Sequence, residues 1–491
     1  MATATLGRPV EPAGRGEETD GVFACWRWDG ARLVARNDRW GFAPLFYRAS
    51  KDDVAISPDV AQLLEPGASA ELDHRALAAF FHLGFFVGED TPFAAVRALP
   101  PGGTLEWAPG SGACVRGAGY WWGDHPPTTR RGVADAFTEI FRDALGRRLP
   151  DDPDERFALP LSGGRDSRQM LLELCALGRP PALCVTHVQI PPLPDDDVRI
   201  ARLVARAVGV EHVVVPLAPS LHQAERRRNA ETSLCADEHA QLVALADYLR
   251  GRTRTTYDGI GADIWLSRNW GTAKRLDLYE SGRLEELAAN MAESLFQIVE
   301  AAHLAPMLSP ELRPAASREL AIERIVAELA RHAAAVNPVL SFYFWNRTRR
   351  EVALAPFAML QRAVPVVHAP YLDRALYDLL SSLPAAYALD PGFRDEIIAR
   401  AHPRHAGLPY ENRSAPGSDA RAMLLRHARE TARYAFARLP RRPRTVDGWR
   451  LLTRGLRTMV SAGYGARAAY LWRPALYLLQ LDEVARTAVG R

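Results

Sequence analysis

The sequence predicts an α/β protein in which helices cover a parallel sheet, a helical part follows, and a smaller, mainly β unit comes first. Residues 157–216 contain short apolar runs that alternate with segments of helical periodicity, which indicates strand–helix–strand units. Residues 21–110 contain short β-type runs broken by tight turns. Beyond residue 420 the chain is rich in arginine and helical in its periodicity.

The composition is that of a globular protein with several domains. At 491 residues the chain is long enough for two or three domains. Its hydrophobic content of 48% and charged content of 24% are ordinary for soluble proteins. A net charge of +3 is too small to indicate nucleic acid or an anionic membrane as a partner, and no apolar stretch is long enough to cross a bilayer.

Cysteine usage and the N-terminal residues favour a cytoplasmic location. The five cysteines are scattered without metal-ligand spacing, so we expect reduced thiols. The first residues lack the apolar core of a secretion signal. Residues 1–20 combine proline, glycine and mixed charge, and we expect a loose, disordered tail there.

The β-rich unit at residues 21–127 shows clear local signals. The dipeptide Asp29-Gly30 between two β-type runs predicts a hairpin. Asp73 is an N-cap candidate for a short helix. We expect, in order, the hairpin, a strand, the helix, a strand and a linker, at residues 22–36, 54–57, 73–81, 99–107 and 111–132.

The α/β unit is expected over residues 128–420. After a helix at 133–149 the pattern gives strand, helix, strand, helix, strand at residues 157–161, 169–177, 182–188, 195–208 and 213–216. In such parallel sheets the ligand lies at the carboxyl ends of the strands. Residues 421–491 then form a helical, arginine-rich extension.

The loop that follows the first of these strands has the chemistry of an anion site. The glycines Gly163 and Gly164 let the backbone approach a ligand closely, and the next helix offers free N–H groups and the positive end of its dipole. Ser162 and Ser167 add hydroxyl donors. Asp166 would repel a phosphate unless Mg²⁺ lies between them. We therefore predict a site for a nucleotide di- or triphosphate with a metal; the alternative is an ordinary turn with a helix cap.

A second strand, at residues 255–257, gives way to a similar loop. Gly259 and Gly261 are followed by Asp263. The alternative to a functional role is a surface aspartate in a glycine turn. Two further polar groups remain open: the cluster Asp237, Glu238 and His239 in a predicted helix, which lines a pocket or faces solvent, and a basic run with Arg347, Arg349 and Arg350, which meets an anion or water.

These motifs resemble those of the asparagine synthetase family. The loop at 162–167 is similar to the Ser-Gly-Gly-X-Asp-Ser loop of ATP pyrophosphatases, which lacks the lysine of the common phosphate loop. Residues 259–263 resemble the glycine turn whose aspartate completes the Mg²⁺ site in that family. Residues 37–47 and 99–102 resemble parts of its glutamine amidotransferase domain.

The resemblance implies a set of roles for this chain. ATP and Mg²⁺ are the implied cofactors, and the fold is that of an ATP pyrophosphatase after a truncated Ntn-hydrolase remnant. Asp166 and Asp263 would hold Mg²⁺ and serve catalysis together with Arg413. The remaining ATP contacts would come from Leu161, Ser162, Gly163, Gly164, Ser167, Val188, Gly259 and Gly261. Asp237, Glu238, His239 and Ile260 would face the substrate.

Three departures from the family pattern bear on activity. The family's glutaminase uses a cysteine where this chain has Ala2, so we predict no glutamine hydrolysis. Ile260 stands where asparagine synthetases have a glutamate and β-lactam synthetases a tyrosine, each tied to activation of the amine. No lysine follows Lys274, so Arg413 is expected to replace the lysine that holds pyrophosphate, although arginine cannot act as an acid near neutral pH.

The expected function is that of an AMP-forming amide ligase. A small-molecule or peptide carboxylate would be activated as an acyl-adenylate, and ammonia or another amine would displace AMP. Asparagine formation, a macrolactam or β-lactam-type cyclisation, and a non-catalytic ATP-binding role all remain open. We expect no nucleic acid and no membrane as partners, and leave open whether the chain forms a homodimer.

Overall fold

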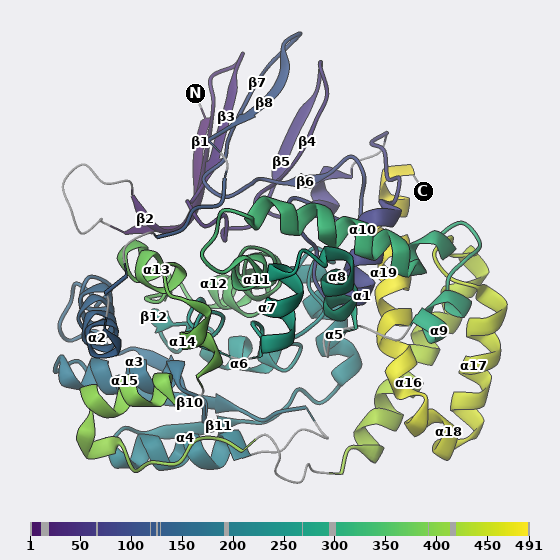
Figure 1. Ribbon diagram of the computed structural model, residues 1–491. Coiled ribbons are helices and arrows are strands. Elements are labelled where there is room, and N and C mark those ends of the chain that lie inside the picture. The colour runs from purple at the N-terminus through teal and green to yellow at the C-terminus, as the bar shows by residue number, and fades with distance from the viewer. Residues whose placement is uncertain are drawn as a thin grey trace.

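The computed structural model describes residues 2–10, 19–64, 67–117, 119–123, 126–127, 129–190, 196–267, 269–293, 301–390, 392–412 and 419–489. Two antiparallel sheets near the N-terminus stand on a larger α/β body, and a group of C-terminal helices lies beside that body (Figure 1). The predicted fold class is confirmed: an antiparallel β region comes first, a five-stranded parallel sheet with helices follows, and the C-terminal part is helical.

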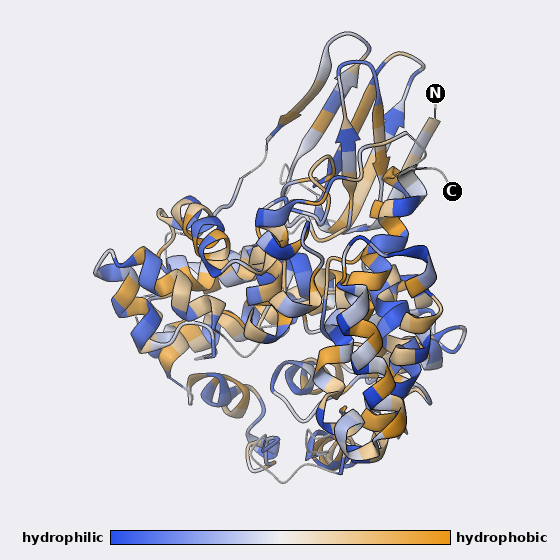
Figure 2. Ribbon diagram, turned by 90° about the vertical axis from the view of Figure 1, so that its right-hand side faces the viewer, coloured by the Kyte–Doolittle hydropathy of each residue, from blue (hydrophilic) through white to orange (hydrophobic). Residues whose placement is uncertain are grey.

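The first antiparallel sheet contains the predicted hairpin. The Asp29 carboxylate accepts hydrogen bonds from the N–H groups of Ala31 and Arg32, and Gly30 takes the left-handed conformation that the turn requires, with φ 101°. The strand order is β1 (Ala2–Val10), β2 (Asp20–Trp28), β3 (Leu33–Asn37), β7 (Thr104–Ala108) and β8 (Gly112–Arg116). Hydrophobic and hydrophilic residues alternate along the N-terminal strands (Figure 2).

Two expectations about this region were wrong. β1 lies within the predicted tail at 1–20 and pairs along its whole length with β2, because its N–H and C=O groups complete the edge of the sheet. β8 lies within the predicted linker at 111–132 and forms a hairpin with β7.

A second, smaller antiparallel sheet and one helix complete the N-terminal unit. Its strands are, in order, β5 (Val54–Ser57), β4 (Phe46–Ala49) and β6 (Arg97–Ala98). Helix α1 (His74–Leu83) begins as predicted, because the Asp73 carboxylate accepts a hydrogen bond from Ala76 N–H at 3.0 Å. The helix ends at Gly84, whose φ is 82°.

The central sheet is parallel throughout. Its strand order is β11 (His212–Val215), β10 (Leu183–His187), β9 (Ala158–Pro160), β12 (Thr255–Tyr257) and β13 (Val366–His368). Helices α2 (Arg130–Gly146), α3 (Asp166–Ala176) and α4 (Asp196–Ala207) are those predicted between the strands. β9 lies in the middle, so the loop that follows it has neighbours on both sides.

The helix predicted to contain Asp237, Glu238 and His239 is not formed; two shorter helices flank these residues. α5 (Leu221–Glu231) and α6 (Leu242–Leu249) are separated by a connection in which Ser233, Leu234 and His239 have positive φ. The placement of Asp237, Glu238 and His239 in a helix was therefore wrong. Non-glycine residues in this conformation are uncommon, so the segment is held by its contacts rather than by its own helical propensity.

The rest of the α/β body is helical. It contains α7 (Ala273–Glu280), α8 (Leu284–Ala292), α9 (Ala301–Leu304), α10 (Arg318–Leu329), α11 (Pro338–Tyr343), a π-helical segment (Phe344–Ala358), α12 (Met359–Ala363), α13 (Arg374–Ser381), α14 (Ala385–Leu389) and α15 (Phe393–Ala401). The C-terminal part consists of α16 (Arg421–Phe436), α17 (Gly448–Val460), α18 (Ala462–Arg467) and α19 (Trp472–Val489).

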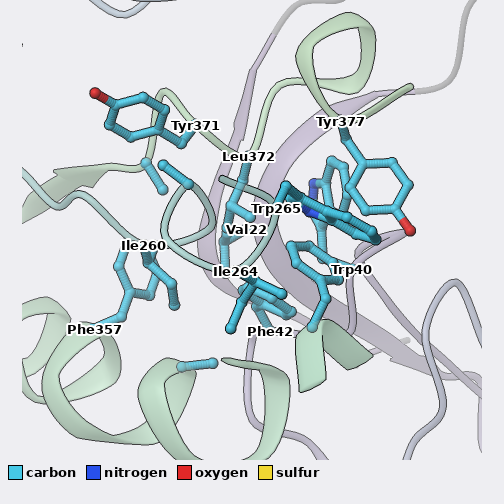
Figure 3. Close-up of a cluster of buried hydrophobic side chains, with 14 of the residues drawn as sticks. Val22, Trp40, Phe42, Ile260, Ile264, Trp265, Phe357, Tyr371, Leu372 and Tyr377 are labelled. Atoms are coloured by element: carbon cyan, nitrogen blue, oxygen red, sulfur yellow. The ribbon is translucent and has the colours of Figure 1, made fainter. Parts of the chain in front are cut away.

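An aromatic cluster packs the N-terminal unit against the α/β body. Trp40 has no exposed surface, and its ring centroid lies 4.9 Å from that of Trp121 and 5.0 Å from that of Tyr377. Figure 3 shows Trp40 and Tyr377 within this cluster. Ile260 and Ile264, from the loop after β12, are buried in the same apolar core. Buried aromatic surface of this extent contributes several kcal/mol per side chain, so the two units share one core.

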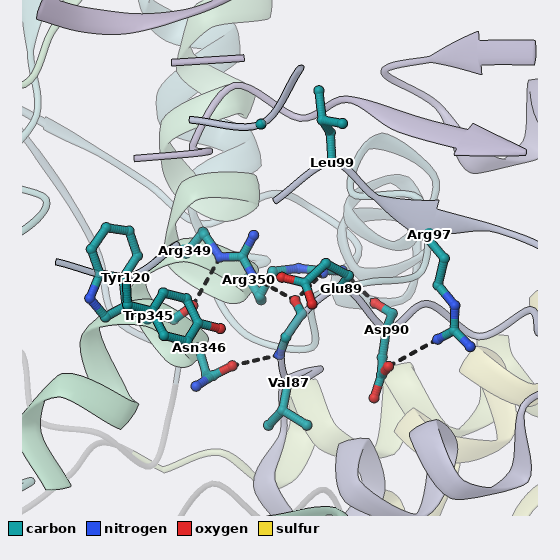
Figure 4. Close-up of polar contacts among 12 residues, drawn as sticks. Val87, Glu89, Asp90, Arg97, Leu99, Tyr120, Trp345, Asn346, Arg349 and Arg350 are labelled. Carbon is teal, nitrogen blue, oxygen red and sulfur yellow. Dashed lines mark hydrogen bonds and ion pairs between the residues drawn. The ribbon is translucent and has the colours of Figure 1, made fainter. Parts of the chain in front are cut away.

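Buried charges reinforce the same interface (Figure 4). Arg349 and Arg350 both donate to the carbonyl oxygen of Gly88, and Gly88 N–H donates to the amide oxygen of Asn346 at 2.6 Å. Within the basic run that was predicted to meet an anion or water, Arg349 and Arg350 therefore bind the backbone of the N-terminal unit. Sequence alone cannot show this, because the carbonyl partner lies about 260 positions earlier.

Candidate functional site

The loop after β9 extends the parallel sheet before it turns. Leu161 N–H donates to the carbonyl oxygen of Val185 at 2.9 Å, and the Thr186 hydroxyl donates back to the Leu161 carbonyl at 2.5 Å. The backbone then turns at Ser162–Gly164, and α3 begins at Asp166, three residues before the predicted start. The glycine loop thus lies at the carboxyl edge of the sheet, where ligands of such sheets bind.

The two serines of the loop form one hydroxyl pair. The oxygens of Ser162 and Ser167 are 2.9 Å apart, and the Ser167 hydroxyl also accepts from Ser162 N–H at 2.9 Å. Gly164 N–H donates to the Ser162 hydroxyl at 3.2 Å. Among the described residues, a Cβ at Gly164 would meet only this hydroxyl, so they leave room for an approaching group on that side of the loop.

The other side of the loop is closely packed. Gly163 N–H donates to the buried carboxylate of Asp197 on α4 at 2.5 Å. A Cβ at Gly163 would lie 3.0 Å from the side chains of Glu411 and Ile200, which explains the need for glycine. Glu411 N–H also donates to the Gly163 carbonyl at 3.2 Å. One of the N–H groups that the sequence assigned to an anion is therefore already used within the chain.

Asp166 lies beside a buried guanidinium that the sequence did not predict. Arg394 Nη2 donates to Asp166 Oδ1 and to the Tyr371 hydroxyl, both at 3.0 Å, and the Tyr371 hydroxyl donates to the Asp166 carbonyl at 2.9 Å. The Arg394 side chain is only 4% exposed. Its Nη1 atom is buried and has no hydrogen-bond partner among the residues that the structure describes. Such an orphaned cationic donor next to a glycine loop is a natural contact for an anion.

The loop after β12 meets the first loop at Asp166. A Cβ added to Gly259 would lie 3.3 Å from the Cβ of Asp166, so the two loops are in contact. Gly261 has φ 107° and packs against Leu372. Asp263 follows on the exposed part of this turn. The structure thus brings the two glycine loops together, while a metal ion shared by Asp166 and Asp263 stays a prediction.

The titratable groups at this edge lie in a dry environment. Burial raises the pKa of Asp258, the first residue after β12, to about 6, although its carboxylate accepts a hydrogen bond from Ile260 N–H at 2.8 Å. At the end of β10, burial and, to a smaller extent, the nearby charge of His239 together lower the pKa of His187 to about 4. Perturbed groups of this kind gather at functional sites, although ion-pair networks also produce them.

In the cluster at 237–239, Asp237 is buried in ion pairs, whereas Glu238 and His239 are partly exposed. Burial raises the pKa of Asp237 to about 6 in spite of ion pairs with Arg473 and Arg228. Glu238 pairs with Arg347 at 2.9 Å. Burial alone would raise the pKa of Glu238, but the charges of Arg347, His239 and Arg473 together outweigh it and the pKa is lowered.

His239 faces a buried carboxylate. Its Nδ1 lies 3.8 Å from Glu351, whose two oxygens accept from the N–H groups of Asp237 and Glu238. Ligand atoms of Glu238, His239 and Glu351 all lie within 4.8 Å of one another. Because Arg347 and two backbone N–H groups already satisfy these carboxylates, we assign no metal to this cluster.

Several contributors to the site were missed in the sequence. Arg165 and Arg168 both lie over the ring of Tyr410, at 4.4 and 3.9 Å, and Arg168 donates to the carbonyls of Leu408 and Pro409. The segment 408–412 thereby covers the glycine loop. Arg165 lies within the loop at 162–167 and Arg168 follows it directly, so the position of these two cations in the sequence was the signal for them.

Of two further predicted site residues, the structure describes one. Val188, at the end of β10, is half-buried, and its N–H donates to the Val215 carbonyl, so it stays a candidate for contact with a base. Arg413 lies outside the described residues, and its role stays a prediction.

Some of the predicted ligand groups among the described residues are suited to a polyphosphate with a divalent ion, and others are not. The hydroxyls of Ser162 and Ser167 and the orphaned Nη1 of Arg394 are suited to phosphate oxygens. Asp166 is the carboxylate suited to the ion, and at present it pairs with Arg394. The N–H group of Gly163 does not contribute, because Asp197 uses it.

Comparison with known proteins gives one local match. Residues 14–121 match the family model of a glutamine amidotransferase domain. No curated protein matches the chain. The match ends before α2, so the parallel α/β region with the two glycine loops follows the matched domain and is not part of it. Within the described part of the chain, no helix combines the length and the apolar character needed to cross a membrane.

Proposed function

We propose that this protein is an AMP-forming amide ligase of the asparagine-synthetase type, which activates a carboxylate as an acyl-adenylate for attack by ammonia or another amine. The observation that carries the proposal is the unpartnered Nη1 of Arg394, buried beside Asp166 and the glycine loop at the carboxyl edge of the sheet. Buried donors normally have partners. Among the described residues the interface arginine Arg349 also has an open Nη1, but Arg394 differs from it in lying beside Asp166 and the glycine loop. An anion at this position would pair with Nη1 of Arg394.

The polyphosphate side of the site is assigned to three groups. Bound ATP supplies the adenylyl group, and Mg²⁺ on Asp166 and Asp263 neutralises phosphate charge. Ser162 and Ser167 donate hydrogen bonds to phosphate oxygens. Arg394, held by Tyr371 and by the face of Phe137 at 4.5 Å, stabilises the charge that builds up on the leaving pyrophosphate. Arg394 thus takes the role that the family resemblance implies for Arg413, and Arg413 stays a second candidate.

The amine side of the site is assigned to His239. Its ring lies close enough to His187 and to Asp258 for their charges to interact, which places it near the ends of β10 and β12. Glu351 lies 3.8 Å from His239 Nδ1 and can orient the ring, so that the other ring nitrogen accepts a proton from the incoming amine. Ile260, buried in the apolar core, contributes packing rather than chemistry.

The source of the amine is proposed to be outside this chain. The matched domain is of the amidotransferase kind, but Ala2 offers no nucleophile and Cys25 lies within β2, half-buried in the sheet. Burial also raises the pKa of the Cys184 and Cys235 thiols to about 12, which keeps them unreactive. Release of glutamate from glutamine by the purified protein would contradict this part of the proposal.

The test is ATP–pyrophosphate exchange in the presence of Mg²⁺ and a panel of carboxylates. Exchange that depends on one class of carboxylate is the expected result, and its chemical class names the substrate. Exchange with aspartate would favour asparagine formation, whereas exchange with a peptide or amino-acid derivative that carries its own amine would favour a cyclase. Absence of exchange with every acid, together with absence of AMP release, would overturn the ligase assignment.

One observation favours a second candidate, a non-catalytic ATP-binding homologue. Gly163 N–H and Asp166, two groups expected to meet ATP and Mg²⁺, both have partners within the chain. If these contacts persist, the site can hold a nucleotide without turning it over. Saturable ATP binding by calorimetry without any AMP release would support this second candidate.

A further inference from the structure

A cavity of about 300 Å³ opens between the two antiparallel sheets of the N-terminal unit. Three tryptophans, Trp26, Trp28 and Trp107, line it from the first sheet, and Val54 and Ile56 of β5 line it from the second. The cavity belongs to a part of the molecule that the proposed ligase reaction does not use. We call it the tryptophan cavity.

The strand register explains how three indoles come to share one cavity. Trp28 pairs with Leu33, and Leu33 pairs with Trp107 on the next strand, so these side chains form one row across the sheet. Trp26 lies two residues before Trp28 and therefore on the same face, whereas Arg27 between them points to the other face and is exposed. The rings of Trp28 and Trp107 are 6.3 Å apart and inclined by 36°.

One of the three rings is held in place by a hydrogen bond. Trp107 Nε1 donates to the carbonyl oxygen of Ser50 at 3.0 Å, which fixes the orientation of the indole. Trp107 is 6% exposed, so it forms the floor of the cavity, while the half-buried Trp26 and Trp28 form its walls.

The indoles of the tryptophan cavity differ from two other tryptophans of this protein. Arg39 lies 4.3 Å from the ring centroid of Trp121, and Arg347 lies 4.4 Å from that of Trp270. Among the described residues, no arginine or lysine lies over Trp26, Trp28 or Trp107. The three indoles of the cavity thus lack the cation that Trp121 and Trp270 already have.

Acidic residues line the cavity on the side of the turn between β4 and β5. Asp53 pairs with Arg48 at 2.5 Å, whereas Asp52 makes no ion pair within the described part of the chain. Lys51 precedes them in the sequence and does not line the cavity. A carboxylate beside aromatic faces favours a positively charged group over a neutral or anionic one.

We propose that the tryptophan cavity binds a small organic ammonium group, such as a trimethylammonium head group or a methylated lysine side chain. The indole faces attract the cation, and Asp52 adds a charge at the edge of the cavity. The volume is sufficient for a group of this size. The site lies outside the glycine loops, so its occupancy and the ligase reaction are separate properties.

Calorimetric titration of the full-length protein tests the proposal. Choline is the free cation, a trimethyllysine peptide is the protein-borne one, and 3,3-dimethylbutan-1-ol is the neutral isostere. We expect one of the two cations to bind at least tenfold more tightly than the alcohol. Trp28→Leu should weaken that binding about tenfold and Asp52→Asn about threefold, in line with the known range of cation–π and surface charge effects.

The control and the contrary outcomes are specific. Lys51→Gln changes a charge beside the cavity without removing a carboxylate, so it should leave binding unchanged or slightly stronger. Tighter binding of choline identifies a free small molecule as the ligand, and tighter binding of the peptide identifies a protein partner. Equal binding of the alcohol, or binding unaffected by both Trp28→Leu and Asp52→Asn in folded protein, would overturn the proposal.

Discussion

Two buried regions of this molecule differ in how their charged groups are paired and in how burial shifts the pKa of their carboxylates. At the interface between the N-terminal unit and the α/β body, the Glu328 carboxylate accepts from the Tyr120 hydroxyl at 2.6 Å and from Arg324 at 3.1 Å, with Arg331 and His332 nearby. Burial alone would raise the pKa of Glu328, but these partners outweigh it and the pKa is lowered.

At the carboxyl edge of the parallel sheet, burial outweighs the partners of the charged groups. The Asp258 carboxylate accepts a hydrogen bond from Ile260 N–H, yet burial raises its pKa to about 6. Burial also lowers the pKa of His187, which is about 4. Among the described residues, both regions contain a buried arginine with an open Nη1, Arg349 at the interface and Arg394 at the edge. The regions therefore differ in the direction of the carboxylate pKa shift, and a raised pKa of this kind is typical of functional sites.

The largest expected effect is on activity, at the edge. Arg394→Met should lower pyrophosphate exchange by about 10²-fold or more, because a positioned cation opposite the developing charge is lost. The matched control is Arg400→Gln, on the same helix but in an exposed pair with Asp135, which should leave exchange unchanged. Equal exchange by both variants would remove Arg394 from the mechanism.

The second effect is on stability, at the interface. Glu328→Gln should lower the free energy of unfolding by about 3 kcal/mol at pH 7, because breaking a buried pair leaves cations without their partner. The pKa of Glu328 is lowered in the folded state, so its contribution is present above its unfolded pKa of 4.5 and is lost as pH falls below that value. Denaturant unfolding should therefore show wild type and variant converging in acid.

The opposite sign is expected for Asp258→Asn at the edge. The folded pKa of Asp258 is about 6 and its unfolded value 3.8, so the wild type loses stability as pH rises from about 4 to 6. The asparagine variant keeps the acceptor for Ile260 N–H and does not titrate. It should be more stable by about 3 kcal/mol above pH 6 and equal to wild type below pH 4. A destabilised variant at pH 7 would contradict the difference drawn between the regions.

The smallest effect is expected for Arg413→Gln. If Arg394 is the cation that stabilises pyrophosphate, this variant should lose less than tenfold in pyrophosphate exchange. A loss as large as that of Arg394→Met would return the role of the family's lysine to Arg413.

What the sequence predicted correctly is local. The Asp29-Gly30 turn, the Asp73 cap and the alternation of strands and helices around Ser162–Gly164 depend on neighbouring residues, and all three were confirmed. What it missed is distant in sequence. Arg394 meets Asp166 across 228 positions, and no periodicity reports such a contact. The break at 232–241 was missed because Ser233, Leu234 and His239 adopt backbone conformations that only their tertiary contacts stabilise.

The proposed reaction requires that two carboxylates, far apart in the chain, bind one divalent ion. A crystal structure with a non-hydrolysable ATP analogue and Mg²⁺ tests this most directly. The prediction is one ion coordinated by both Asp166 and Asp263 and by phosphate oxygens, with Arg394 turned toward the phosphates. An ion bound away from these carboxylates, or a nucleotide bound away from the glycine loop after β9, would contradict it.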